Sequence, residues 1–192
     1  TDKLILFCTN GRFYTIDADK LPGGRGNGEP VRLMIDLDNE HDIVTLFKHE
    51  PGRTLIVAST KGHGLLVDED DVIASKRGGK VVLNLAAGAE ACACAVAQGD
   101  TVGVIGQNRK LLLFPIEDVP KMTRGRGVLL QRYKDGGLSD VAVFTYSDGL
   151  TVGESRARSR SFGAKELKDW RGKRAQAGRL PPKGFPRHNR FY

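Results

Sequence analysis

The chain has 192 residues, of which 40% are hydrophobic, and it contains 24 glycines. This length suffices for one core of ordinary size or two small ones, and the hydrophobic content excludes a chain that is disordered throughout. Many glycines between short apolar segments are typical of an all-β protein with tight turns.

The net charge of +7 is concentrated at one end of the chain. Residues 1–150 carry 18 Lys and Arg against 20 Asp and Glu, whereas residues 151–192 carry 12 against 3. The net charge is therefore −2 over residues 1–150 and +9 over residues 151–192. This asymmetry points to an acidic partner, and nucleic acid is the commonest partner for this pattern.

The three cysteines, Cys8, Cys92 and Cys94, are an odd number without the spacing of a disulfide framework, which is typical of a reducing compartment. No run approaches 18 apolar residues, and the N-terminus has no signal-peptide pattern. We therefore expect a cytoplasmic protein without a membrane partner. Because the first residue is Thr1 and a strand follows almost at once, we expect a piece of a longer chain.

The expected strands begin with a unit at about residues 3–51. Asn10-Gly11 lies between two apolar runs and favours a hairpin turn with positive φ. A short acidic connection and a glycine-rich loop follow, and two further strands complete the unit. The expected strands of this unit are 4–8, 13–16, 31–37 and 43–48.

Two further units, at about 52–99 and 100–149, repeat this order of hairpin, acidic connection, basic glycine loop and two strands. The expected strands of the second unit are 54–58, 65–67, 81–85 and 92–96. Those of the third unit are 101–105, 111–114, 128–132 and 141–146.

A shift of 47 residues superposes the second unit on the third without a gap, so that Leu66 matches Leu113 and Asp71 matches Asp118. Repeats of this length are typical of propellers, in which small sheets pack around an axis because none can bury both faces alone. We therefore predict an all-β, propeller-like ring of four-stranded blades. Three to four units are few for a closed ring, so we expect it to be open or incomplete.

A fourth unit, at about 150–177, is degenerate. Its beginning and its basic loop resemble those of the other units, at Leu150–Gly153 and Trp170–Arg174. The arginine-rich stretch 156–160 between them lacks the pattern of a strand. The prolines in Leu180–Pro186 exclude regular secondary structure, because proline fixes φ and lacks a backbone donor. We expect one β domain at 1–177 and an extended, irregular basic tail at 178–192.

The basic, glycine-rich loops recur at equivalent places and form the candidate nucleic-acid site. Equivalent loops of a propeller lie on one rim, and glycines allow backbone N–H groups to approach phosphates. Such a rim would bind and bend DNA with little base readout, although the loops could also be plain solvated turns. The candidate DNA-binding residues are Arg25, Lys76, Arg77, Lys80, Arg109, Lys110, Lys121, Arg124, Arg126, Arg171, Lys173 and Arg174.

Other chemistry has weaker support in the sequence. Gly23–Gly28 is glycine-rich, but no Lys-Ser/Thr follows as in a P-loop, so a turn is the better interpretation. Cys92 and Cys94 lack a second ligand pair, and the four histidines are scattered, so we expect buried thiols and no metal site. The sequence has no Gly-x-Ser-x-Gly nucleophile motif and no polar cluster outside the repeats, so we expect no catalytic residue, cofactor or small-molecule substrate.

The repeated unit resembles the C-terminal β-pinwheel domain of bacterial type IIA topoisomerases. The residues that carry this resemblance are the hairpin Leu55–Gly62, the acidic connection Asp71-Val72 and the basic box Lys76–Lys80. The final stretch, Arg174–Pro186, is similar to the end of the A subunit in the topoisomerase IV branch of that family.

The gyrase branch of the family carries, in its own A subunit, a Gln-Arg-Arg-Gly-Gly-Lys-Gly box that supports full DNA wrapping. In this chain Ser75 replaces the Gln of that box and Val81 replaces its last Gly. The difference favours the topoisomerase IV branch. A gyrase-type wrapping domain and a propeller that binds other proteins remain as alternatives.

The resemblance implies a β-pinwheel fold and an accessory role. The domain would bind and bend the transported DNA segment and tune the preference among supercoiled and linked substrates. Its partners would be double-stranded DNA, the rest of the topoisomerase IV A subunit and the B subunit with its ATPase, at the bacterial chromosome. ATP, Mg²⁺ and the catalytic residues would belong to other regions of the enzyme, so this chain alone is expected not to be an enzyme.

Overall fold

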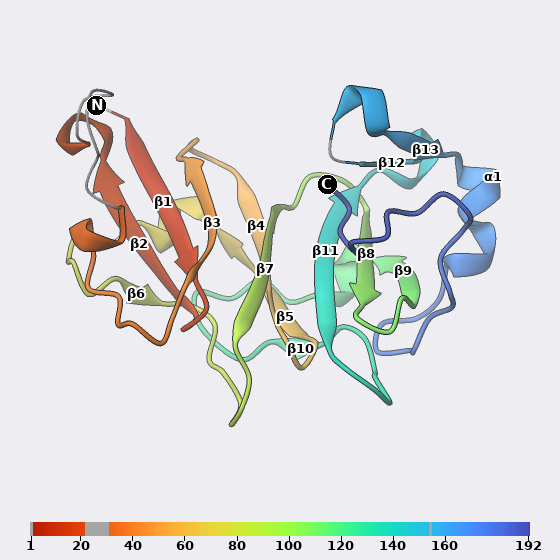
Figure 1. Cartoon of the computed structure of the whole chain (residues 1–192), viewed down its shortest axis with the longest axis horizontal. Helices are drawn as coiled ribbons and strands as arrows, with labels where there is room; N and C mark the ends of the chain where they lie inside the picture. Colours follow the sequence, from red (N-terminus) through yellow and green to blue (C-terminus); the bar gives the residue numbers. More distant parts are fainter. Residues whose placement is uncertain (1, 22–30, 154) are drawn as a thin grey trace.

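A computed structural model describes residues 2–21, 31–153 and 155–192. Four small antiparallel sheets follow one another along the chain, which confirms the expected all-β class (Figure 1). The first and the last sheet lie toward opposite ends of the long axis, so the ring of blades is open. Arg25 and the loop Gly23–Gly28 lie outside the described residues.

Thirteen strands and several short helical turns make up the described chain. The strands are β1 (Lys3–Cys8), β2 (Arg12–Asp17), β3 (Ile43–Lys48), β4 (Thr54–Ser59), β5 (His63–Asp68), β6 (Lys80–Val81), β7 (Ala91–Val96), β8 (Thr101–Gly106), β9 (Leu111–Pro115), β10 (Val128–Leu129), β11 (Leu138–Phe144), β12 (Leu150–Val152) and β13 (Arg160–Phe162). The helical turns are η1 (Ala18–Lys20), η2 (Val31–Met34), η3 (Glu69–Val72), η4 (Ile116–Asp118), η5 (Tyr146–Asp148), η6 (Arg156–Arg158), α1 (Ala164–Leu167) and η7 (Lys168–Trp170). Among the described residues, no helix has the length and apolar character needed to cross a membrane.

The strand orders are β3-β1-β2-β6, β10-β5-β4-β7, β11-β8-β9 and β12-β13. The first two sheets each take one edge strand from the next unit of the chain. Arg12 of β2 pairs with Val81 of β6, and Gly64 of β5 pairs with Val128 of β10. The prediction that each unit supplies all four strands of its own blade is therefore wrong.

The open edge of each hairpin explains why strands are exchanged between units. An open edge presents unpaired N–H and C=O groups, and the segment that leaves the next unit satisfies them. The predicted strand at 31–37 does not form for a related reason. The edge that it would occupy is taken by β6, and its first four residues form the 3₁₀ turn η2.

A close backbone contact at the exchanged strand requires glycine. Gly127, just before β10, has a φ of +77°, and a Cβ atom there would lie 1.9 Å from the carbonyl oxygen of Gly64. No side chain fits in that space, and φ in this range disfavours other residues. The glycines of the basic loops thus serve the packing of the fold as well as the proposed approach of a ligand.

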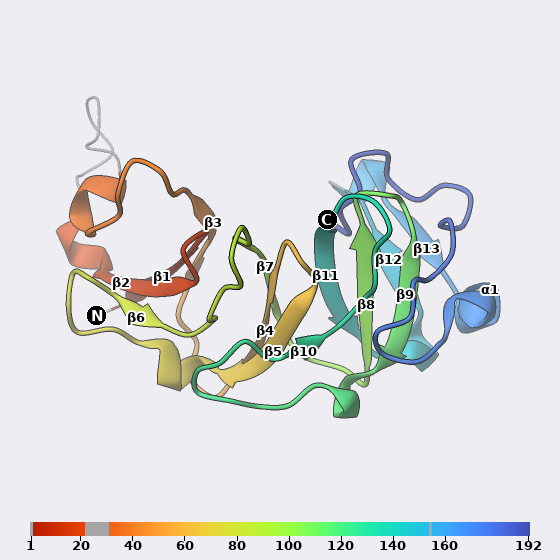
Figure 2. The same ribbon diagram turned by 90° about the horizontal axis from the view of Figure 1, so that it is seen from below.

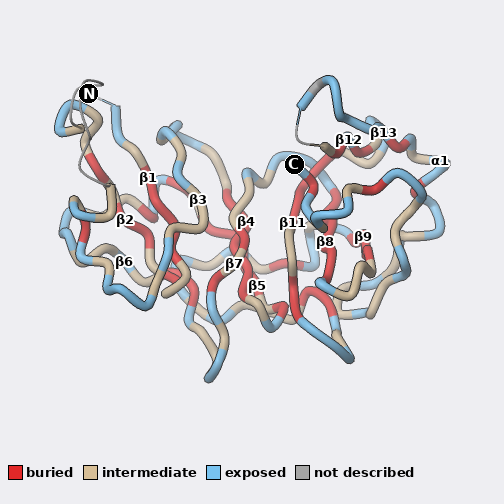
Figure 3. The backbone as a smooth tube through the Cα atoms, viewed as in Figure 1, coloured by how far each residue is buried: buried red, intermediate tan, exposed pale blue. Residues whose placement is uncertain are grey.

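The core lies between consecutive sheets instead of at one centre. On β4, Ile56 faces a cluster with Val104 of the third sheet, whereas the adjacent Val57 faces a cluster with Phe7 of the first sheet. A third cluster joins the third sheet to β12, β13 and the C-terminal segment. Buried positions therefore follow the strands through the middle of the molecule (Figure 3). Each such aliphatic side chain stabilises the fold by about 1.5–3 kcal/mol.

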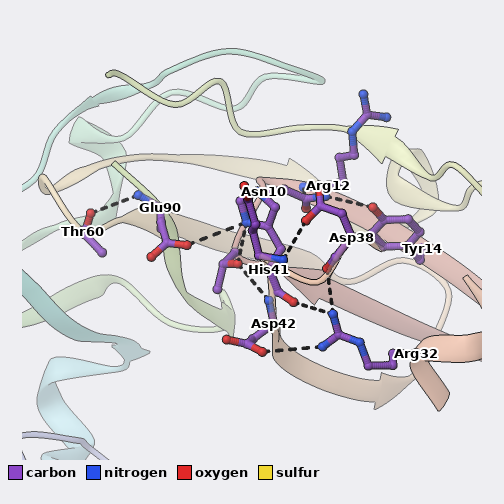
Figure 4. A network of polar contacts seen from close by, with 11 residues as sticks. Asn10, Arg12, Tyr14, Arg32, Asp38, His41, Asp42, Thr60 and Glu90 are labelled. Atoms are coloured by element: carbon purple, nitrogen blue, oxygen red, sulfur yellow. Dashed lines mark hydrogen bonds and ion pairs between the residues drawn. The ribbon is translucent and has the colours of Figure 1, made fainter. Parts of the chain in front are cut away.

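Polar contacts hold the segment after η2 against the first sheet (Figure 4). Arg32 donates to the carbonyl oxygen of His41 at 2.8 Å and lies 3.5 Å from the carboxylate of Asp42. His41 shares a 2.9 Å hydrogen bond with the hydroxyl of Thr9, and its ring nitrogen lies 3.7 Å from the carboxylate of Glu90. Because Glu90 directly precedes β7, this network links the first and second sheets.

A buried carboxylate fixes the linker between the same two sheets. Glu69 is fully buried, and its oxygens accept hydrogen bonds from Arg53 Nε at 2.8 Å and from the backbone N–H of Glu50 at 2.7 Å. A ring nitrogen of His49 contacts the same carboxylate. A buried charge is tolerated only when it is paired and hydrogen-bonded, so these contacts hold the linker in one conformation.

The C-terminal segment 178–192 contains no helix or strand, yet it folds back on the third and fourth sheets. Phe185 and Phe191 are 4% and 0% exposed, and their rings meet edge to face with centroids 5.6 Å apart. The backbone N–H of Phe191 donates to Asp140 at 2.9 Å. The structure thus differs from the extended tail that the sequence suggested, because two aromatic side chains fill the core beside the short strands of the fourth unit.

We expect the substitution Phe191→Ala to lower the free energy of unfolding by about 3–5 kcal/mol, since it leaves a cavity in this core. The neighbouring Tyr192 is 62% exposed, so Tyr192→Ala should change stability by no more than about 0.5 kcal/mol. Urea unfolding of the two variants measures both values. Equal losses would show that the segment is not anchored through Phe191.

Candidate nucleic-acid interface

Three basic segments run along the edges of three successive sheets. The first, 74–84, carries β6 and lies along the first sheet. The second, 121–132, carries β10, and the third, 171–179, forms bridges from its two ends to Leu113 and Leu111 of β9. In Figures 1 and 2, β6 and β10 lie on the same lower side of the molecule. We call these three segments together the basic band.

Backbone hydrogen bonds join the segments of the basic band to one another. Asn84 donates its backbone N–H to the carbonyl of Gly125 at 2.8 Å, and Gly125 donates to the carbonyl of Val82 at 2.9 Å. One unit further, Ala175 donates to the carbonyl of Leu130 at 3.0 Å. The three segments are therefore joined to one another through their backbones and are not separate turns.

Several cations of the band are exposed and available to a ligand. Lys76, Arg126 and Lys173 are exposed, and within the described chain their side chains form no hydrogen bond or ion pair. Arg77 lies 3.4 Å from a carboxylate oxygen of Asp36 but remains 62% exposed. Arg124, also exposed, donates to the side chain of Asn84 at 3.3 Å.

Other predicted residues of the band take part in contacts within the domain. Lys80 donates to the carbonyl of Asp71 at 2.6 Å, and Arg171 lies over the ring of Tyr146 at 4.1 Å. Arg174 is half-buried and donates to the carbonyl of Leu129 at 2.8 Å. Lys80 and Arg171 still reach the surface, whereas Arg174 has its main contact inside the fold.

The structure places Arg109 and Lys110 in the turn between β8 and β9, beside the second and third segments of the band. Arg109 donates to the carbonyl of Pro186 at 3.0 Å and to the side chain of Asn189 at 2.7 Å. Its guanidinium therefore holds the C-terminal segment. Lys110 is half-buried, and its carbonyl accepts a hydrogen bond from Gln131.

Sequence reasoning missed the residues that support the loops. Arg12 donates to the carbonyl of Gly78 at 3.1 Å and so fixes the first basic loop, and Asn84 fixes Arg124. The sequence gives no signal for either contact, because the bonded residues lie 66 and 40 positions apart.

Cys8 is buried, and Cys92 and Cys94 are partly buried. All three are free, and burial raises the pKa of Cys8 to about 11 and the pKa of Cys92 and Cys94 to about 12. They therefore stay protonated at neutral pH, and a protonated thiol is a poor nucleophile and metal ligand. Among the described residues, no group of three His, Cys, Asp or Glu side chains could hold a metal ion.

Lys121 connects the band to the acidic end of β5. Its ammonium lies 2.9 Å from a carboxylate oxygen of Asp68, and this hydrogen bond lowers the pKa of the Asp68 carboxyl. The folded-state pKa is thus below the unfolded value. At pH values above the pKa of Asp68 in the unfolded chain, the pair therefore stabilises the fold. This contribution is lost as the pH falls through the pKa of Asp68 in the folded chain.

We expect Lys121→Met to raise the pKa of Asp68 toward its ordinary value, because the largest cause of the shift is removed. A titration of the Asp68 carboxyl carbon by NMR measures this change. Lys76→Met serves as the control, since Lys76 has no contact with Asp68, and should leave that pKa unchanged. An unchanged pKa in the Lys121 variant would show that the pair does not form in solution.

Comparison with known proteins agrees with this geometry. A model of the family described as "DNA gyrase C-terminal domain, beta-propeller" matches residues 2–50, 53–93 and 102–141. The chain is 46% identical over its full length to the A subunit of the DNA topoisomerase 4 of Caulobacter vibrioides, and 28% identical over 90% of its length to that of Escherichia coli K12. The chain spans 25% and 24% of the length of these two relatives.

Solved structures agree with the sequence relatives. The E. coli ParC C-terminal domain superposes with a TM-score of 0.79 at 25% identity, over 95% of this chain and 78% of that one. A DNA gyrase A C-terminal domain superposes with a TM-score of 0.68 at 16% identity, over 96% and 63%, which shows a shared fold. The chain belongs to the family of the DNA gyrase C-terminal domain, beta-propeller, in which it corresponds to the C-terminal β-pinwheel domain of the topoisomerase IV A subunit, ParC.

Proposed function

We propose that the chain binds double-stranded DNA along the basic band, as an accessory domain of the topoisomerase IV A subunit. The observation that supports this most is the row of backbone hydrogen bonds that joins the basic segments of three successive units. Unconnected solvated turns would not need to share one surface. A duplex also presents regularly spaced phosphates, so a repeating row of cations is complementary to it.

The chemistry of the band favours contact with the DNA backbone over contact with bases. Exposed Arg and Lys side chains bind phosphate oxygens, and the glycines between them leave backbone N–H groups accessible. Base readout in the major groove is carried out by a helix or a two-stranded ribbon that enters it. The described residues of the band form loops and strands paired to a sheet, so we propose binding without sequence preference.

The shape of the molecule supports a bent path for the DNA. The sheets follow one another in an open arc, and the band passes from sheet to sheet along it (Figure 2). DNA that follows such a surface bends, and backbone contacts offset the cost of bending. We propose that the domain holds the transported segment in this way and so tunes the choice between supercoiled and linked substrates.

The enzyme's chemistry would take place outside this chain. The rest of the A subunit and the B subunit, which carries the ATPase, are the proposed protein partners, and ATP and Mg²⁺ would be used there. With about 5–8 phosphate contacts, the logarithm of the DNA affinity should fall against the logarithm of salt concentration with a slope of about −5 to −7.

We expect the double substitution Arg77→Glu and Arg124→Glu to weaken binding of all duplex sequences alike. Removing two phosphate contacts should reduce the magnitude of the salt slope by about 2, and the introduced carboxylates add repulsion. Fluorescence anisotropy with duplexes of unrelated sequence over a range of salt concentrations measures affinity and slope.

The matched control is Lys165→Glu with Lys168→Glu, which makes the same change in net charge at exposed positions outside the band. Equal losses in both double variants would mean that net charge alone matters and that the band is not the binding surface. The same assay tests the protein-binding alternative, which expects the unmodified chain to bind no duplex.

A further inference from the structure

A second cationic feature lies on the fourth unit, outside the basic band. A cavity of about 390 Å³ separates the β12–β13 hairpin from the C-terminal segment. Three arginines, Arg158, Arg160 and Arg187, line it together with His188, and no carboxylate is among the described residues that line it. We call this cavity the arginine pocket.

The walls of the arginine pocket are held in place by the core beneath them. Phe185 is buried in the third and fourth sheets and anchors the turn that carries Arg187. The backbone N–H of Gly153 donates to the carbonyl of Phe191 at 2.9 Å, which ties the hairpin to the same segment. The pocket is therefore formed by two chain segments that are each fixed to the fold.

Its arginines differ in how far they are engaged. Arg160 lies over the ring of Phe162 at 4.6 Å and 3.3 Å from the carboxylate of Glu166, so its guanidinium is fixed at the wall. Arg158 and Arg187 are exposed, and within the described chain their side chains form no hydrogen bond or ion pair. Among the described residues, neither guanidinium is engaged, so both are available to an anion.

The residue types in the pocket favour phosphate groups as the ligand. Planar guanidinium groups bind phosphate oxygens in pairs, with better geometry than lysine offers. The surrounding surface is also positive, since residues 151–192 carry a net charge of +9 and both Lys183 and Arg190 are exposed. An extended positive surface around a pocket fits a polyanion better than a single small anion.

The hairpin that borders the pocket lies apart from the first two segments of the band. In Figures 1 and 2, β12 and β13 lie higher in the view than β6 and β10. A duplex that lies along β6 and β10 therefore need not pass over the pocket.

We propose that the arginine pocket binds the phosphate backbone of a second DNA segment while the first segment lies on the basic band. The domain would then hold two duplexes at once. This inference rests on the proposed function for the first segment only.

A two-duplex capture assay with the full 192-residue chain tests the proposal. One biotinylated duplex is immobilised, the protein is bound to it, and the retention of a second, fluorescent duplex is measured. We expect Arg158→Glu with Arg187→Glu to reduce the captured second duplex by about tenfold or more, since two phosphate contacts become repulsive. The affinity for a single duplex, measured by anisotropy, should stay within about twofold.

The double variant Lys165→Glu with Lys168→Glu is the control, because it changes the net charge equally on the same unit of the chain but outside the pocket. It should capture the second duplex as the unmodified chain does. Thermal unfolding of both variants shows that each retains its fold.

Three outcomes would overturn the proposal. If the arginine variant captures the second duplex as well as the unmodified chain does, the pocket does not hold DNA. If the unmodified chain binds a polyglutamate peptide and the arginine variant does not, the ligand of the pocket is an acidic protein. A parallel loss of single-duplex binding would place the pocket on the path of the first segment. If the unmodified chain binds one duplex but captures no second one, only this inference fails, whereas absence of any duplex binding refutes the proposed function as well.

Discussion

The structure depends on the pairing of each hairpin edge with a strand from the next unit. β6 closes the edge of the first sheet and β10 that of the second, and bridges to Arg171 and Arg179 continue this arrangement on β9. The same segments carry the basic loops. The backbone interaction that satisfies the sheet edges therefore also positions the three basic segments.

The band combines its cations with nearby acidic groups at the surface. The Arg77–Asp36 and Lys121–Asp68 pairs are largely exposed, so solvent screens them and each contributes little to stability. Arg77 also donates to the carbonyl of Leu33 at 3.0 Å. The buried Glu69 is different, because its partners Arg53 and His49 lie at the linker between two sheets, where loss of a partner would leave an unpaired charge.

Local signals in the sequence predicted the hairpins, the repeats and the basic loops, because each depends on neighbouring residues. Gly11 has the expected positive φ of +81° after Asn10. The strand exchange could not be predicted, since the sheet that an edge strand joins depends on residues far away in the sequence. Lys80-Val81 has the same local pattern whichever sheet it joins. The role of Arg109 was missed for the same reason, because its partners Pro186 and Asn189 lie 77 and 80 residues further on.

The fourth unit shows how a repeat can lose strand pattern and gain charge. Its two strands have only three residues each, and the core beneath them is completed by Phe185 and Phe191 from a segment without regular structure. Since packing there no longer depends on alternating apolar residues, the hairpin can carry Arg158 and Arg160 at the surface. A fourth blade of ordinary composition would bury more apolar area but would remove most of the charge excess of the chain. Phe185 and Phe191 thus supply apolar burial that the two short strands of this unit do not provide.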